Sequence, residues 1–228
     1  MKENKFNQSF WPSYVDIMTT LFAIMLILFV INFSRFKVKE KELRKLADKY
    51  TEIQSIYKAV ENIDPMYFEF NKKYVKHIFK IQVTFNTYDF SLYKLKDDVT
   101  GHHERANALR NHLIDAGKEI QKTIINLQKN DSIKGDIKYL VVIEGQASKD
   151  GYNKDLYHNN YVLSYQRALA LNEFWKKRGI DFSEMPRCEL LISGSGEKGV
   201  PRNEQNEYSN QRFLIHIVPV IGNIRLEK

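Results

Sequence analysis

Asp16 is the residue whose type and position most directly suggest chemistry, because it lies inside an almost wholly apolar segment. That segment, FWPSYVDIMTTLFAIMLILFVINF, runs from residue 10 to residue 33 and holds no other charged residue. A carboxylate within a membrane is costly, so it is usually retained where it faces a protein interior or an ion pathway. Asp16 is therefore predicted to carry an ion. The alternative is a carboxylate near the membrane interface that reaches out to water.

The neighbours of Asp16 at helical spacing favour the ion-carrying interpretation. Ser13, Asp16, Thr20 and Ala23 fall on one face of a helix, and Thr19 flanks that face. The other faces carry Ile, Leu, Phe and Met. A stripe of small and polar residues suits close contact with another helix in a membrane.

The apolar segment is predicted to be a retained single-span anchor over residues 11–34, after a short tail of residues 1–10. About 23 helical residues reach roughly 34 Å, which is enough to cross a bilayer. The segment is too long for a cleavable signal peptide and no small-residue cleavage site follows it. Trp11 and Tyr14 suit one membrane interface.

The positive charges of the chain give an ambiguous signal. The formal net charge is +7, which suits nucleic acid, anionic lipid or an acidic polymer without choosing among them. No basic and aromatic motif typical of nucleic-acid modules is present. Two lysines precede the span and six basic residues follow it closely, so the positive-inside rule alone would place the C-terminal side in the cytoplasm: Lys2 and Lys5, then Arg35, Lys37, Lys39, Lys41, Arg44 and Lys45.

Residues 35–63 are highly charged and predicted to be helical. From Leu43 the apolar residues recur at steps of 3 and 4 through Val60, which is the spacing of a heptad seam, although Lys39 interrupts it near the membrane. We expect a juxtamembrane helix that forms a dimeric, parallel coiled coil. An amphipathic helix packed on its own domain is the equally weighted alternative.

Residues 64–228 show strands that alternate with helices, which predicts an α/β domain of sandwich type with helices on one or both faces of a sheet. Four strands and two helices are expected. The strands are 77–85, 137–145, 188–196 and 211–220, and the helices are 103–128 and 159–179, the latter ended by Gly179.

Catalytic, metal and cofactor sites are not expected. Cys188 is the only cysteine, so a cysteine cage and an intrachain disulfide are excluded, while pairing with a second chain stays open. The adjacent His102 and His103 point to different sides of any regular element. The glycine-rich stretch 194–199 lacks the Gly-Lys-Ser/Thr ending of a phosphate loop.

The stretch WPSYVDIMTTLF resembles the start of the flagellar stator B subunit of MotB type and its relatives, which include the B subunit of Zorya anti-phage defence systems. Tyr14, Asp16, Met18 and Thr19 match the shared aromatic-x-Asp-apolar-Met-Thr core. The resemblance implies that Asp16 carries protons or sodium ions, with Tyr14, Thr19 and Thr20 lining the pathway. It also implies a homodimer inside a ring, expected to be pentameric, of multi-span MotA-like A subunits. The short distance from span to domain is more similar to the Zorya type than to flagellar subunits.

The stretches IEGQAS, NYVLSYQRALAL, ISGSGEKGVP and NQRFLIHI resemble the peptidoglycan-binding domain of the OmpA family, in order and spacing, over residues 143–217. The resemblance implies that Arg167 grips a carboxylate of the diaminopimelate in the wall peptide. Asn160 and Arg212 match further positions of the family, and Gln211 departs from an arginine. Ser148 stands where the family has the aspartate that holds the ligand's ammonium, and Asp150, two residues on, is a candidate substitute.

This second resemblance implies an orientation opposite to that of the charge count. A wall-binding domain belongs in the periplasm, so the chain is expected to be a single-pass protein of the bacterial inner membrane with a cytoplasmic N-terminus. Three functions follow in order: an ion-driven motor subunit for phage defence or motility, a membrane-tethered wall anchor without ion flow, and a cytoplasmic basic domain that touches nucleic acid.

Overall fold

The computed structural model describes residues 10–129 and 137–221. The chain divides into two compact units, of which the first ends at Thr51 and the second begins at Glu52. Each unit is described separately below.

The first unit consists of most of helix α1, which runs from Phe10 to Glu61 over 52 residues. Among the described residues, α1 is the one helix long and apolar enough to cross a membrane, and none of its apolar window is buried. The predicted apolar helix is therefore present. Unbroken helix is expected here, because the only proline within α1, Pro12, lies in the first turn, where no intrahelical donor is lost.

The second unit is built on one five-stranded mixed sheet with the strand order β1-β2-β5-β3-β4. The strands β3 and β4 are parallel, and all other neighbours are antiparallel. The bounds are Phe68–Asn71 for β1, Lys76–Phe79 for β2, Ile137–Gly145 for β3, Cys188–Gly194 for β4 and Phe213–Ile221 for β5. The predicted α/β fold with a single apolar helix is confirmed.

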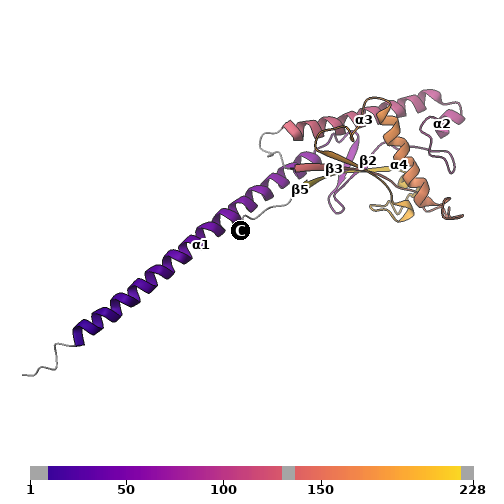
Figure 1. Cartoon of the computed structure of the whole chain (residues 1–228). Helices are drawn as coiled ribbons and strands as arrows, with labels where there is room; N and C mark the ends of the chain where they lie inside the picture. The colour runs from indigo at the N-terminus through magenta and orange to yellow at the C-terminus, as the bar shows by residue number, and fades with distance from the viewer. Residues whose placement is uncertain (1–9, 130–136, 222–228) are drawn as a thin grey trace, which may run out of the picture. The chain divides into compact units, whose positions relative to one another are not determined.

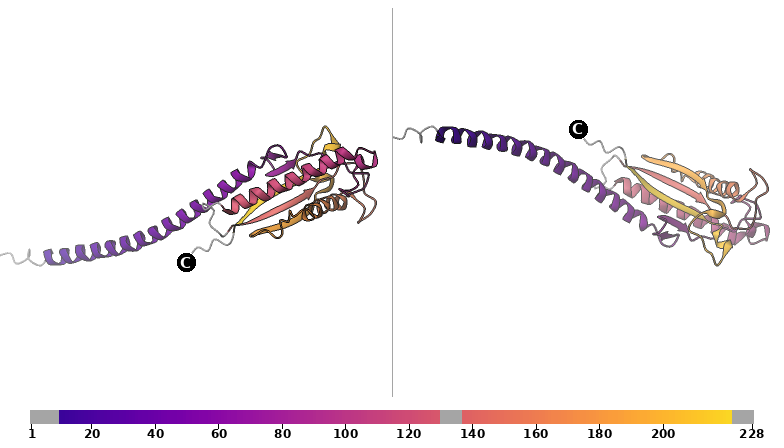
Figure 2. Two further views of the ribbon diagram at one scale, coloured as in Figure 1. Left: turned by 90° about the horizontal axis from the view of Figure 1, so that it is seen from above. Right: turned by 90° about the horizontal axis from the view of Figure 1, so that it is seen from below.

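One face of this sheet is covered by the two long helices of the unit, α3 (His103–Lys129) and α4 (Asn160–Lys176) (Figures 1 and 2). Alternate residues of β3 point into the layer between sheet and helices and are fully buried, with Tyr139 and Val141 as examples. Trp175 of α4 lies in the same layer, and its indole Nε1 donates to the Leu113 carbonyl oxygen of α3 at 2.7 Å. The helices and the sheet thus share one hydrophobic core.

The last turns of α1 belong to this core. Ile56, Val60 and Ile63 are buried among the core side chains, and the Val60 carbonyl oxygen lies 2.7 Å from His77 Nε2 of β2. For these turns the structure shows a helix packed on its own domain, which was one of the two alternatives for residues 35–63. The seam residues Leu43 and Leu46 are exposed, and their pairing in a coiled coil stays a prediction.

Two features of the sheet differ from the sequence expectation. The strand expected over residues 77–85 ends at Phe79, because the chain then leaves the sheet while Val83 and Phe85 still turn into the core. The alternation of apolar residues correctly indicated which side chains are buried. It did not indicate a strand, because the side chains of this loop are buried in the same way. The edge strand β1 (Phe68–Asn71) was not expected, since its four residues are too few to show a period.

Candidate functional site

A cavity of about 570 Å³ lies where the loops after β2 and β3 meet α4. The lining residues come from segment 84–88, the turn 148–150, α4 and a loop before β5, together with Lys96 at the start of the short helix α2 (Lys96–Val99). From α4 the cavity is lined by Arg167, and from the loop by Glu207, Tyr208 and Gln211. This volume is in the range of sites that hold small ligands.

Two glycines allow α4 to sit close to the ends of β3 and β4. A Cβ atom on Gly145 would lie 1.9 Å from the Ser164 carbonyl oxygen, and one on Gly194 would lie 2.4 Å from the Tyr165 backbone nitrogen. No side chain fits at either position. The glycines of the stretches IEGQAS and ISGSGE thus bring Arg167 to the cavity.

Arg167 is the buried cation of the cavity. Its side chain is 4% exposed, its Nε donates to the Asp89 carbonyl oxygen at 3.1 Å, and its guanidinium carbon lies 4.4 Å from the centre of the Phe85 ring. Burial lowers the pKa of Arg167 to about 10, while the nearby carboxylates of Asp150 and Asp89 oppose that shift. The group is charged at neutral pH. In the part of the chain that is described, no acceptor binds its two terminal nitrogens.

Among the described residues, Asp150 is one of two acidic residues that line the cavity, and three donors hold its carboxylate; the other, Glu207, is paired with Arg202. The Tyr152 backbone N–H and Asn160 Nδ2 donate to Oδ1 at 3.0 and 2.9 Å, and the Ser148 hydroxyl donates to Oδ2 at 3.2 Å. Burial alone would raise the pKa of Asp150, but these hydrogen bonds outweigh it and hold the pKa below its usual value. Ser148 thus serves to orient the aspartate that follows it.

The two charges share the cavity without forming an ion pair. Within residues 10–129 and 137–221, no nitrogen of Arg167 lies within 4.0 Å of the Asp150 carboxylate. A buried charge without a close partner is unfavourable unless something else compensates it. Because both side chains line one cavity, the arrangement suits a ligand that carries both signs of charge.

The other residues predicted to bind peptidoglycan have different roles in the structure. Arg212 does not line the cavity, because its Nε donates to Gln146 Oε1 and its Nη2 to the Pro201 carbonyl oxygen. Its contacts indicate a loop clamp, which is a different role from the ligand contact expected of it. Gln211 does line the cavity, and its Nε2 donates to the Ser148 hydroxyl at 2.9 Å. Asn160 does not line the cavity but donates a hydrogen bond to Asp150, and so helps to orient that carboxylate.

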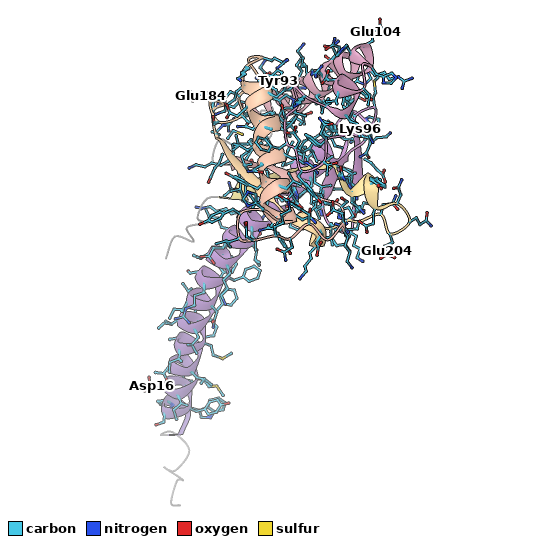
Figure 3. The ribbon with its side chains drawn as sticks, turned by 90° about the vertical axis from the view of Figure 1, so that its right-hand side faces the viewer. Asp16, Tyr93, Lys96, Glu104, Glu184 and Glu204 are labelled. Carbon is cyan, nitrogen blue, oxygen red and sulfur yellow. The ribbon has the colours of Figure 1, made fainter. Side chains whose placement is uncertain are left out.

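In the first unit, Asp16 is exposed on α1 (Figure 3). The hydroxyls of Thr19 and Thr20 both donate to its backbone carbonyl oxygen at 2.9 Å, so within one chain they serve the helix backbone. Tyr14 packs edge-on against Trp11 with ring centres 6.5 Å apart. The three predicted pathway residues therefore lie within about one turn of Asp16.

Sequence reasoning missed the segment that closes the cavity opposite α4. Phe85, Tyr88 and Lys96 line the cavity, and the carbonyl of Asp89 anchors Arg167. These residues stand some 80 positions before Arg167 and follow no recognisable spacing. The available signal was the density of aromatic residues in FNTYDFSLY, which is unusual for a surface loop. Metal chemistry is not indicated, since the described residues contain no cluster of three metal-ligating side chains.

No family model and no curated protein matches the chain. Solved structures with a similar fold include the periplasmic domain of Helicobacter pylori MotB, at 17% identity and a TM-score of 0.40, covering 66% of this chain and 86% of that one. A putative MotB like protein from Desulfovibrio vulgaris has 14% identity and a TM-score of 0.34, with 79% and 98% covered. The peptidoglycan-associated lipoprotein from Burkholderia pseudomallei has 13% identity and a TM-score of 0.34, with 60% and 88% covered.

Proposed function

We propose that this chain is the B subunit of an ion-driven motor of the bacterial inner membrane, and that its sheet domain anchors the motor to peptidoglycan. The observation that carries the proposal is the buried Arg167 guanidinium that shares a cavity with the Asp150 carboxylate but does not pair with it. The wall-binding role rests on this pair, and the motor role rests on Asp16.

The ligand that fits this pair is the free end of diaminopimelate, in which one carbon carries both a carboxylate and an ammonium. A guanidinium pairs with two carboxylate oxygens through its planar fork, and the two terminal nitrogens of Arg167 are oriented for that task once Nε is held by Asp89. Asp150 would accept hydrogen bonds from the ammonium. In this role Asp150 would replace the aspartate that the OmpA family has at the position of Ser148.

Asp16 is proposed to carry protons or sodium ions between this chain and a surrounding ring of multi-span A subunits. The residue is exposed on an apolar helix, which is unfavourable in lipid unless a partner helix covers it. One charge that crosses the membrane yields about 2.3 kcal/mol per 100 mV, so several ions would drive each working step. Two copies of the chain in one ring would place two carboxylates in the pathway.

The wall lies outside the inner membrane, so the proposal requires a cytoplasmic N-terminus and a periplasmic sheet domain. The output assigned to the motor is phage defence of the Zorya type. What favours it over motility is the short stalk, because the helix that contains the span ends at Glu61 and β1 begins at Phe68.

The wall-binding part is tested by co-sedimentation of the detergent-solubilised full chain with purified peptidoglycan sacculi. Arg167→Gln removes the cation, and we expect binding to fall at least tenfold, because a charge-assisted hydrogen bond contributes about 1.5–3 kcal/mol. Arg178→Gln is the matched control, since Arg178 follows the same helix but its Nη1 donates to Phe174 and Tyr93 outside the cavity. Equal binding by the two variants at equal melting temperature would refute the site.

A further inference from the structure

A pair of tyrosine rings stands beside the charged floor of the cavity. Tyr88 and Tyr152 stack with ring centres 4.0 Å apart and an angle of 21° between their planes. Lys154 Nζ lies 5.3 Å from the centre of the Tyr88 ring and 5.9 Å from that of Tyr152. We call these two rings the tyrosine platform.

The platform is built on the two loops that anchor the charged pair. Tyr88 immediately precedes Asp89, whose carbonyl oxygen holds Arg167. Tyr152 donates its backbone N–H to Asp150. Each loop therefore contributes one ring and the anchor of one charge, so the platform and the charged pair keep a fixed spacing.

Tyr88 combines exposure with an unfavourable backbone. Its φ of 59° lies in the left-handed region, which a bulky side chain rarely adopts. Its side chain is 49% exposed and lines the cavity, as does Tyr208, which is 78% exposed. Strained backbone of this kind persists where the surroundings enforce it and tends to gather at binding sites. If Tyr88 served only to stabilise its loop by stacking on Tyr152, its ring would not need to line the cavity.

We propose that the tyrosine platform binds a pyranose ring of the glycan strand, next to the peptide held by Arg167 and Asp150. The face of a sugar ring presents C–H groups, which pack favourably on an aromatic face, and its hydroxyls accept hydrogen bonds from an ammonium such as that of Lys154. The inference rests on the proposed function, because the peptide that it accompanies is that of the wall. It adds recognition of the sugar to recognition of the stem peptide.

The test compares two soluble probes on the full chain in detergent by isothermal titration calorimetry. One is the N-acetyl tetrapeptide with meso-diaminopimelate in third position, and the other is the same tetrapeptide on its N-acetylglucosamine–N-acetylmuramic acid disaccharide. Both have a blocked N-terminus, so only the sugars differ. We expect the disaccharide to tighten binding about fivefold, the size of effect expected for one aromatic contact.

Tyr88→Asn should abolish that gain, so that the disaccharide probe binds this variant no more tightly than the tetrapeptide probe does. Asparagine tolerates the left-handed backbone, so the loop should keep its path. Tyr88→Phe should keep the gain, because it keeps the ring. The matched control is Tyr157→Asn, a tyrosine that is 73% exposed and does not line the cavity. A sugar gain that survives Tyr88→Asn, or no gain in the unmodified chain, overturns the proposal.

Failure of the proposed function would appear separately, as tetrapeptide binding that Arg167→Gln does not weaken or as no tetrapeptide binding at all. In that case chitotetraose, a sugar chain without peptide, tests the platform alone. Binding of chitotetraose that Tyr88→Asn removes and Tyr157→Asn retains would uphold the platform. Absence of such binding would reject it together with the peptide site.

Discussion

Arg167 and Asp150 are held by neighbours that leave the two terminal nitrogens of Arg167, the atoms proposed to bind the ligand, without a hydrogen-bond acceptor among the described residues. Among the described residues, only Nε of Arg167 donates a hydrogen bond within the protein. The donors to Asp150 come from its own turn and from Asn160. Such preorganisation lowers the cost of ordering a binding site when the ligand arrives. The site therefore suits a zwitterionic ligand better than a simple anion.

Asp16→Asn is the residue change that separates a motor from a passive anchor. Asparagine keeps the shape of the side chain and removes the titratable charge, so we expect ion flux through the assembled complex to fall to background. Sacculus binding should stay unchanged, because Asp16 lies in the first unit and the cavity lies in the second. Flux is measured in vesicles that contain both subunits, with abundance checked by immunoblot.

Thr19→Ser is the companion variant for that measurement. It keeps the hydroxyl, which donates to the backbone of α1, and should retain most of the flux. Normal ion flux in Asp16→Asn would leave the chain as a tethered wall anchor.

At the residue scale, the family pattern locates part of the site and misplaces or omits other residues. Arg167, Asp150 and Ser148 were expected at one site, and they meet there. Arg212 was expected with them, but its guanidinium holds the Pro201 loop. The role of Asp89 could not be predicted, because its contact is made by a backbone carbonyl.

At the scale of elements, the contact between β3 and α4 is the one on which the cavity depends. Gly145→Ala would place a methyl carbon 1.9 Å from the Ser164 carbonyl oxygen, so α4 would have to move. We expect destabilisation of about 2 kcal/mol or more and loss of sacculus binding. Thermal unfolding followed by circular dichroism measures the first effect.

Gly151→Ala is a partial control for that prediction, since nothing lies within 4 Å of the added carbon. Its φ of 77° brings a backbone penalty without a clash. A melting temperature for Gly145→Ala above that of Gly151→Ala would contradict the packing argument.

On the face of the sheet opposite the core helices, a buried carboxylate makes stability depend on pH. Glu144 accepts hydrogen bonds from Lys76 Nζ and His216 Nε2, both at 2.8 Å. Burial alone would raise its pKa, but these partners lower it to about 2 from the usual 4.5. The stabilisation is therefore complete above pH 4.5 and is lost as pH falls from 4.5 toward 2, with a total of about 3 kcal/mol.

Denaturant unfolding between pH 7 and pH 2.5 checks this dependence. Glu144→Gln should be less stable at pH 7 and should lose much less stability over the acid range than the unmodified chain. Glu189→Gln is the control, because Glu189 is exposed on β4 of the same sheet. A parallel acid response of Glu144→Gln and the unmodified chain would show that the cluster is not the cause.

The bounds of β3 could be predicted from the sequence more fully than the packing of the helix after residue 35. The strand β3 was expected at the bounds it has, since a buried central strand reads as an unbroken apolar run. The helix after residue 35 was expected, and the packing of its final turns on the chain's own domain was one of two alternatives that the sequence left open. Heptad spacing describes one apolar face, and that face is the same whether the partner is a second chain or the protein's own sheet.

At the scale of the whole molecule, the chain joins two units with separate tasks, a carboxylate on an apolar helix and a charged cavity in a sheet domain. The proposed function needs both. Leu43, Leu46 and Tyr50 are exposed on α1, and the proposed dimer would cover these side chains.

The most direct test of the central claim is whether the cavity distinguishes diaminopimelate from lysine. The two N-acetyl tetrapeptides differ only in the carboxylate that Arg167 is proposed to bind. Titrated into the detergent-solubilised full chain, the lysine peptide should bind at least tenfold more weakly, since it forfeits a bidentate pair. In Arg167→Gln the two peptides should bind alike. Equal affinities in the unmodified chain would contradict the account.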